Sequence, residues 1–293
     1  MTVKERLTTQ DYWEKAYAEP VAVPSAVMEA PAAPGRMKRL LHAVLGERNF
    51  EAMRTNYADA MAWQVIYPTY LPKTPGLKFL EVGSAPGTNL IRMHETFGYE
   101  PYGIEYTENG VRQNRELLAR HGIAPENCIH ADFFSDEIAA RYRNHFDIIY
   151  SGGFIEHFTD VESVIARHLE LLAPGGILMI DIPNLRGLNW AVTRVVNGDI
   201  LPVHNLSIMD KRAFSALFER HAVEPLFCDY YGTVNFLLFF TDNRYFRRIV
   251  ERATGLAQLA CNLVLNRVMR SRGARVESRH TSPYLLYIGR KKA

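Results

Sequence analysis

The chain has 293 residues, of which 47% are hydrophobic and 23% charged, with a net charge of +2, so it can bury the core of one large domain with additions. Its three cysteines stand far apart with no paired spacing, which excludes a disulfide framework and a zinc knuckle and indicates a reduced compartment. The N-terminus lacks the apolar segment of a signal peptide, and no apolar run approaches the roughly 18 residues of a membrane span. We therefore expect a cytoplasmic protein.

Residues 1–75 are predicted to form a helical N-terminal cap region. Helices are expected around residues 10–18, 36–45 and 50–67, and a proline- and alanine-rich linker covers residues 19–35. Several aromatic residues in this region could cover a ligand, but we interpret them as packing residues and not as site residues. They are Tyr12, Trp13, Tyr17, Tyr57 and Trp63.

From Leu77 the pattern changes to short apolar strands that alternate with longer amphipathic segments. Strands are predicted at residues 77–83, 101–106, 127–131, 146–151, 176–182, 223–230 and 283–289. Helices are predicted at residues 88–97, 108–121, 135–143, 160–172 and 210–220. This alternation predicts an α/β fold with a Rossmann-like, seven-stranded, mostly parallel sheet and helices on both faces. The core would comprise residues 76–231 and 283–293, and ligands should bind beyond the carboxyl ends of its strands.

Two insertions interrupt the alternation, at residues 183–209 and 232–282. The second is predicted to form one or two basic amphipathic helices, broken near Gly255. Charge is polarised in the same direction, because residues 244–293 contain twelve lysines and arginines against two acidic residues. The simplest interpretation is a helical cap with its arginines in water. A peripheral membrane contact, a homodimer interface through residues 244–279, and a cradle for an anionic substrate stay open as alternatives.

The most informative segment is 77–87, where an apolar strand ends in Glu81 and breaks into a loop with Gly83 and Gly87. Glycine allows close approach of the backbone to a ligand, and the helix predicted at residues 88–97 would point its first amides at a polar group above the loop. The spacing matches neither the three-glycine dinucleotide pattern nor a phosphate loop. The segment therefore predicts a nucleotide-sized ligand without naming it.

Acidic residues also follow the next two predicted strands. Glu105 can accept hydrogen bonds from both hydroxyls of a ribose. Asp132 could accept from the exocyclic amine of adenine, and Phe133 could cover the ring face. Each alone could be an ordinary strand-end acid, but together they fit one ligand.

With these motifs, the chain resembles the class I S-adenosylmethionine-dependent methyltransferases. The matching segments are 81–87, Glu105, Asp132-Phe133, 146–150 with 154–158, and 171–176, which holds a Pro-Gly-Gly sequence before a strand. The resemblance covers about residues 77–231 and the last strand. It implies S-adenosylmethionine as cofactor and S-adenosylhomocysteine as product. The implied contacts are Glu81, Gly83, Ser84, Ala85, Gly87, Glu105, Tyr106, Asp132 and Phe133, with Ala85 standing where many members have a third glycine.

Within that family, Glu156-His157 and the segment 181–184 are similar to the ubiquinone-type O-methyltransferases and to relatives that act on sugars and natural products. A hydroxyl is a poor nucleophile until it loses its proton, so a base near the methyl group is useful. We expect His157 to be that base, with Asp181 orienting it or sharing its role and His204 as a second candidate. Ribosomal RNA 2′-O-methyltransferases need lysines around the acceptor ribose, but after its fourth strand this chain has Ser151, Gly152 and Gly153 instead. Nucleic acid is therefore disfavoured as a partner.

In some relatives, two glutamates, the His beside the second and a later His hold a divalent ion. Glu156, His157 and His204 match that set, but Gly153 stands at the first glutamate, so we predict no metal ligands and keep a divalent ion only as the less favoured alternative. The resemblance implies an O-methyltransferase that acts on a hydroxyl of a small or medium-sized acceptor, such as a natural product, a sugar or a lipid-linked intermediate. An N-methyltransferase of a small molecule and a non-catalytic cofactor-binding module are the alternatives.

Overall fold

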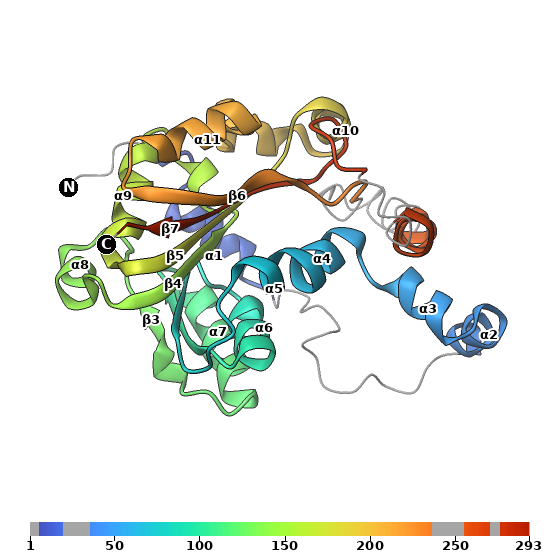
Figure 1. Cartoon of the computed structure of the whole chain (residues 1–293), viewed down its shortest axis with the longest axis horizontal. Helices are drawn as coiled ribbons and strands as arrows, with labels where there is room; N and C mark the ends of the chain where they lie inside the picture. Colours follow the sequence, from blue (N-terminus) through green and yellow to red (C-terminus); the bar gives the residue numbers. More distant parts are fainter. Residues whose placement is uncertain (1–5, 20–35, 236–254, 270–275, 293) are drawn as a thin grey trace.

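Seven strands form one sheet in the computed structural model, which describes residues 6–19, 36–235, 255–269 and 276–292 (Figure 1). The strand order is β3-β2-β1-β4-β5-β7-β6, and β7 runs antiparallel to both of its neighbours while the other pairings are parallel. The predicted seven-stranded, mostly parallel α/β fold is confirmed. The strands are β1 (Lys78–Val82), β2 (Glu100–Glu105), β3 (Cys128–His130), β4 (Phe146–Gly152), β5 (Leu172–Pro183), β6 (Val223–Tyr231) and β7 (Tyr284–Lys291).

Helices cover both faces of this sheet (Figure 1). Side chains alternate across each strand, so Leu178 and Ile180 of β5 pack on one face while Ile177 and Met179 pack on the other. The first face is covered by α8 (Asp136–Tyr142), α9 (Val161–Leu171) and α11 (Lys211–Glu219). The second is covered by α4 (Tyr57–Met61), α5 (Tyr67–Tyr70), α6 (Thr88–Phe97) and α7 (Glu108–Arg120).

The N-terminal region contains α1 (Gln10–Ala16), α2 (Arg36–Leu45) and α3 (Glu47–Arg54). The single helix predicted at residues 50–67 is wrong, because the chain leaves the helical conformation at Thr55 and begins a new helix after Asn56. The side chain of Asn56 accepts hydrogen bonds from the N–H groups of Ala58 and Asp59, which is the role of an N-cap. A π-helical turn at Ala62–Ile66 then joins α4 to α5.

The second insertion packs against this break. Residues 255–264 form a helix that continues as a π-helical turn, Leu265–Met269. Its Asn262 donates to the carbonyl of Met53, and Asn266 donates to the carbonyls of Ala52 and Thr55, so amide side chains satisfy the end of α3. Gly255, where the break was predicted, is the first described residue of this helix; the residues before it and most of the predicted basic face lie outside those described. Among the described residues, no helix is long and apolar enough to cross a membrane.

Strand β5 begins earlier than predicted. The helix before it ends at Leu171, and Leu172 already pairs with Phe146, four residues before the predicted start of the strand. The Pro-Gly-Gly sequence therefore lies within extended backbone, where the register between β4 and β5 shifts. Gly175 has a φ of 76°, which glycine adopts without the steric penalty of a Cβ atom. The first insertion follows β5 and contains α10 (Gly187–Asn197).

Gly232, just after β6, should be essential to the attachment of α4. Its φ is 70°, and an added Cβ would lie 2.4 Å from Cβ and 2.9 Å from Cα of Ala58. We predict that Gly232→Ala lowers the free energy of unfolding by about 3 kcal/mol, since an unfavourable φ and an overpacked contact add. Urea unfolding measures this loss. Gly122→Ala is the matched control, because Gly122 has a φ of 72° with no atom within 4 Å of the added Cβ, and about 1 kcal/mol is expected. Equal losses would contradict the packing argument.

Candidate functional site

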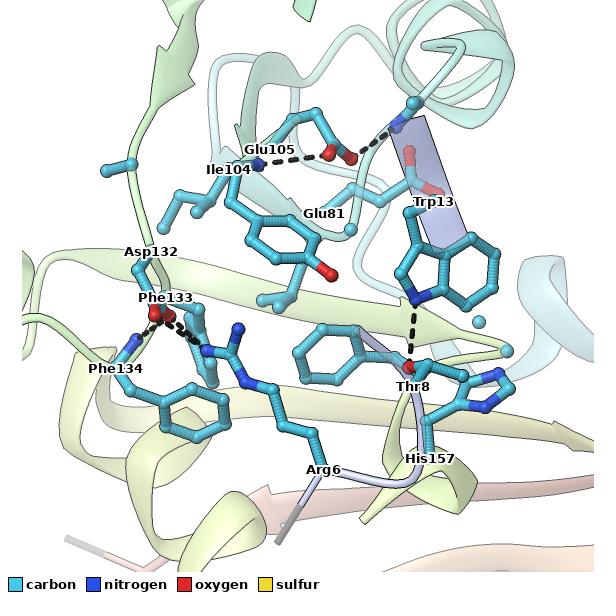
Figure 2. A pocket seen from close by; sticks show the side chains of 18 of the residues that line it. Arg6, Thr8, Trp13, Glu81, Ile104, Glu105, Asp132, Phe133, Phe134 and His157 are labelled. Carbon is cyan, nitrogen blue, oxygen red and sulfur yellow. Dashed lines mark hydrogen bonds and ion pairs between the residues drawn. The ribbon is translucent and has the colours of Figure 1, made fainter. Parts of the chain in front are cut away.

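A cavity of about 280 Å³ opens at the carboxyl ends of β1 to β4 and is lined by the loops that follow these strands and by residues 6–17 (Figure 2). Most of the predicted site residues line it. They are Glu81, Gly83, Ala85, Glu105, Tyr106, Asp132, Phe133 and His157. Ser84, Gly87, Asp181 and His204 do not line this cavity.

The loop after β1 is shaped by glycine and by one buried amide. Gly83 has a φ of 70°, and its N–H donates to the carbonyl of Ile104 at 2.9 Å. Gly87 is the N-cap of α6 and has a φ of 98°, and an added Cβ would lie 2.7 Å from Oδ1 of Asn114. The amide of Asn114 also donates to Oγ of Ser84 at 2.6 Å. Ser84 and Gly87 therefore hold the loop in shape from behind, and the wall of the cavity is formed by Gly83 and Ala85.

Glu81 is a buried carboxyl group at the floor of the cavity. Its Oε1 accepts a hydrogen bond from the side-chain amide of Asn89 at 2.7 Å, while Oε2 has no partner. Burial raises the pKa of Glu81 to about 8, with the nearby Glu105 adding to the shift. A cationic group in the cavity would supply the missing partner of this carboxyl.

Glu105 is almost fully oriented by its own loop. Its Oε1 accepts hydrogen bonds from the N–H groups of Tyr106 and Thr107 and from the Thr107 hydroxyl at 2.7 Å. Its Oε2 has one long contact, 3.4 Å from the N–H of Ala85. One carboxylate oxygen is thus fixed to the protein while the other is free to accept from a ligand in the cavity.

In Figure 2, Asp132 and Phe133 lie on the side of the cavity opposite Trp13 and His157. Phe133 is buried against the rings of Phe134, Phe154 and His168. Asp132 is half-exposed, and its carboxylate is paired with the guanidinium of Arg6 at 2.6 Å. Sequence reasoning gave no indication of this Arg6 contact.

The N-terminal segment, residues 6–17, contributes to the wall of the cavity, which was not predicted. Trp13 and Tyr17, which we interpreted as packing residues, line the cavity together with Thr8. The segment is held in place because Glu14 accepts hydrogen bonds from the N–H groups of Glu108 and Asn109 at the start of α7. The cluster of aromatic residues in the sequence was the only signal, and nothing in its spacing separates a lining residue from a packing residue.

His157 and His204 stand side by side, with ring centroids 4.5 Å apart. Each donates its Nδ1–H to a backbone carbonyl, His157 to Val203 at 2.7 Å and His204 to Ile200 at 2.6 Å. Burial lowers the pKa of both imidazoles, that of His157 to about 3, so both are neutral near pH 7 with the lone pair on Nε2.

Glu156 completes this cluster. It is fully buried, and neither carboxyl oxygen has a hydrogen-bond partner; Nε2 of His157 lies 3.9 Å from Oε1. Burial raises the pKa of Glu156 to about 8. The ligand atoms of Glu156, His157 and His204 lie within 4.8 Å of one another, a donor set that suits Zn²⁺, Mn²⁺ or Co²⁺.

Asp181 does not orient His157 in the structure. Its side chain lies on the same face of β5 as those of Ile177 and Met179, where it accepts a hydrogen bond from the hydroxyl of Tyr231. Burial raises its pKa to about 7. The expected role was assigned from the position of Asp181 at a strand end, whereas the backbone carbonyl of Val203, from the first insertion, orients the imidazole.

Comparisons with known proteins agree with this fold. The sequence matches the methyltransferase domain family over residues 33–223. A similar solved structure is the geranyl diphosphate C-methyltransferase of Streptomyces coelicolor A3(2) with Mg²⁺, geranyl diphosphate and S-adenosyl-L-homocysteine, at 10% identity and a TM-score of 0.56 over 96% of this chain and 97% of that chain. A geranyl diphosphate methyltransferase bound to its substrate and sinefungin matches at 12% identity and a TM-score of 0.58 over 96% and 99%.

The phosphoethanolamine N-methyltransferase 2 of Haemonchus contortus is also similar, at 14% identity and a TM-score of 0.52, over 88% of this chain and 59% of that chain. No curated protein matches the sequence. The family match covers well over half of the chain, and the glycine loop and strand-end acids surround one cavity. The chain therefore belongs to the methyltransferase domain family, as a class I S-adenosylmethionine-dependent methyltransferase.

Proposed function

We propose that the protein transfers the methyl group of S-adenosylmethionine to a hydroxyl of a small or medium-sized acceptor, such as a natural product, a sugar or a lipid-linked intermediate. The observation that carries the proposal is the neutral imidazole of His157 in the cavity wall, beside the buried carboxyl of Glu156. In the proposed reaction the C–S bond of the sulfonium breaks as an O–C bond forms in line with it. The hydroxyl proton passes to Nε2 of His157.

The hydrogen bonds of His157 support this role. Because Nδ1–H is committed to the Val203 carbonyl, the lone pair sits on Nε2, which can accept a proton. Trp13 packs its ring edge-to-face against the imidazole, with centroids 5.1 Å apart, and excludes water from that side. Burial raises the pKa of Glu156 to about 8, so its carboxyl is mostly protonated near pH 7; the fraction that is ionised would stabilise the imidazolium formed, since its Oε1 is 3.9 Å from Nε2 of His157.

The cofactor is assigned to the cavity residues by their chemistry. In this proposal the free oxygen of Glu105 accepts from the ribose, the unpartnered oxygen of Glu81 receives the ammonium of the methionine moiety, and Asp132 accepts from the adenine amine. The glycine loop then lies beneath the cofactor. Ser84 and Gly87 contribute through the shape of the loop.

Loss of Nε2 from His157 should abolish most turnover. His157→Asn keeps an N–H near the Nδ1 position for the Val203 carbonyl but removes the proton acceptor, and we expect kcat to fall about 10²- to 10⁴-fold with cofactor affinity nearly unchanged. The measurement is S-adenosylhomocysteine release with hydroxyl acceptors. His168→Asn is the matched control, because His168 is equally buried and donates Nδ1–H to Val164 but does not line the cavity.

Three results would separate the alternatives. Full activity of His157→Asn would exclude the proposed base. Turnover of amines in place of hydroxyls would identify an N-methyltransferase. Tight cofactor binding with no turnover on any acceptor would identify a binding module.

Binding of S-adenosylmethionine should release a proton near pH 7. Glu81 in the ligand-free protein has a pKa raised to about 8, so it is mostly protonated at pH 7 and must ionise to receive an ammonium group. Affinity should therefore rise between pH 6 and 7.5, by less than the tenfold per pH unit that one proton allows. Calorimetry in buffers of different ionisation enthalpy measures the proton. Glu81→Gln should remove both the proton release and the pH dependence; proton release that persists in this variant would assign it to another group.

A divalent cation held by Glu156, His157 and His204 is a second candidate for activating the acceptor, and the two unpartnered oxygens of Glu156 favour it. Such a cation would lower the pKa of a hydroxyl bound to it. In this alternative the Nε2 atoms of His157 and His204 would bind the ion, so Nε2 of His157 would not accept the hydroxyl proton. This candidate runs against the sequence-based prediction of no metal ligands, which rested on the missing first glutamate.

Cobalt provides a test that does not depend on turnover. If the cluster holds an ion, one equivalent of Co²⁺ should give a visible d–d absorption band, and Glu156→Gln and His204→Asn should each weaken Co²⁺ binding at least tenfold. His168→Asn again serves as the control. The absence of a band with folded protein would exclude the cation and leave the imidazole as base.

A further inference from the structure

Arg6 makes three contacts at the end of the cavity where Asp132 lies (Figure 2). One guanidinium nitrogen donates to both carboxylate oxygens of Asp132, at 2.7 and 2.6 Å. The guanidinium carbon also lies 5.2 Å from the centroid of the Tyr106 ring and 5.5 Å from that of Phe134. A flat, nitrogen-rich group is thus held at a carboxylate, next to two aromatic faces.

These are the contacts that an adenine ring with its exocyclic amine would use. An amine N–H needs a carboxylate acceptor, and a planar ring system needs aromatic or apolar faces. The assignment of adenine to Asp132 belongs to the proposed function, and the following step rests on it. We propose that Arg6 is an internal ligand of the adenine subsite, and that the cofactor binds by displacing its guanidinium from Asp132.

Displacement needs only the side chain to move. The backbone of Arg6 pairs with that of Phe158, and the N–H of Leu7 donates to the carbonyl of His157 at 2.8 Å. The Arg6 side chain is 29% exposed and that of Asp132 46% exposed, so the guanidinium can turn into water. A pair this exposed is weak, and a cofactor can replace it.

Displacement of Arg6 makes the affinity for an adenine nucleoside depend on the strength of the Arg6–Asp132 pair. The apparent affinity for an adenine nucleoside equals the intrinsic affinity multiplied by the fraction of protein molecules in which the Arg6 guanidinium is not bound to Asp132. Salt screens the Arg6–Asp132 pair and increases that fraction. The affinity for a neutral nucleoside should therefore rise with ionic strength. Because such a ligand has no net charge of its own to screen, this rise would report on the Arg6–Asp132 pair.

Adenosine is the appropriate probe, because it reports on the adenine and ribose contacts and carries no ammonium group for Glu81. Calorimetric titration should show that Arg6→Gln binds adenosine about fivefold more tightly than the unchanged protein, from the loss of an exposed ion pair and a cation–π contact. Raising the salt concentration should increase the affinity of the unchanged protein but not that of Arg6→Gln. Arg112→Gln is the matched control, since Arg112 is exposed on α7 and paired with Glu116; its affinity and salt response should equal those of the unchanged protein.

The opposite result has a clear meaning. Weaker adenosine binding by Arg6→Gln would make Arg6 a cover over the bound base, and equal binding without a salt effect would remove it from the subsite; either overturns the proposal while the cofactor site stands. Glu105→Ala, which should abolish adenosine binding, checks that site separately. If neither the unchanged protein nor Arg6→Gln binds adenosine or S-adenosylmethionine, both the cofactor site and the role of Arg6 are wrong.

Discussion

Burial of three carboxyl groups at the carboxyl ends of neighbouring strands is the constraint on which the site depends. Glu81 in β1, Glu156 after β4 and Asp181 in β5 are buried, each has at least one oxygen without a hydrogen-bond partner, and burial raises their pKa values to about 8, 8 and 7. Between about pH 4.5 and 8 the native state holds protons that the unfolded chain has released, so these groups make the ligand-free protein less stable as pH rises. The apolar residues packed on both faces of the sheet offset that cost.

This constraint suits the chemistry of a sulfonium donor. S-adenosylmethionine carries a positive charge on sulfur that S-adenosylhomocysteine lacks, and carboxyl groups that ionise beside the cavity would attract the first more strongly than the second. A cationic ligand would also replace the water that an ionised carboxyl group otherwise needs around it. Aromatic residues such as Trp13 and Tyr17, which exclude water, can therefore line the cavity. In the proposed reaction, transfer of the methyl group removes the charge and with it the reason for tight binding.

The sequence predicted the sheet, and the meeting of strand-end acids at one cavity, because both depend on local rules. Apolar strands with period-two alternation determine the faces, and the residue after a parallel strand must lie at the sheet's carboxyl edge, which brings Glu105 and Asp132 to one cavity. Tertiary contacts account for the failures. Asp181 is at the predicted edge of the sheet, but its side chain points to the face on which it accepts a hydrogen bond from Tyr231. The helix predicted through Thr55 breaks where the side-chain amide of Asn266, far later in the chain, donates to the Thr55 carbonyl. No pattern within residues 6–17 predicts which part of the sheet they cover.

That N-terminal segment joins the two ends of the site. Arg6 contacts Asp132 at one end, while Trp13, seven residues later, packs against His157 at the other. Tyr17 is buried close enough to Glu81 and Glu105 for both carboxylates to raise its pKa further above the normal value, after burial itself. One short stretch therefore contacts Asp132, the carboxyl pair and the imidazole, and its backbone at Arg6 and Leu7 is held by Phe158 and His157, so the proposed displacement of the Arg6 side chain would leave the segment itself in place.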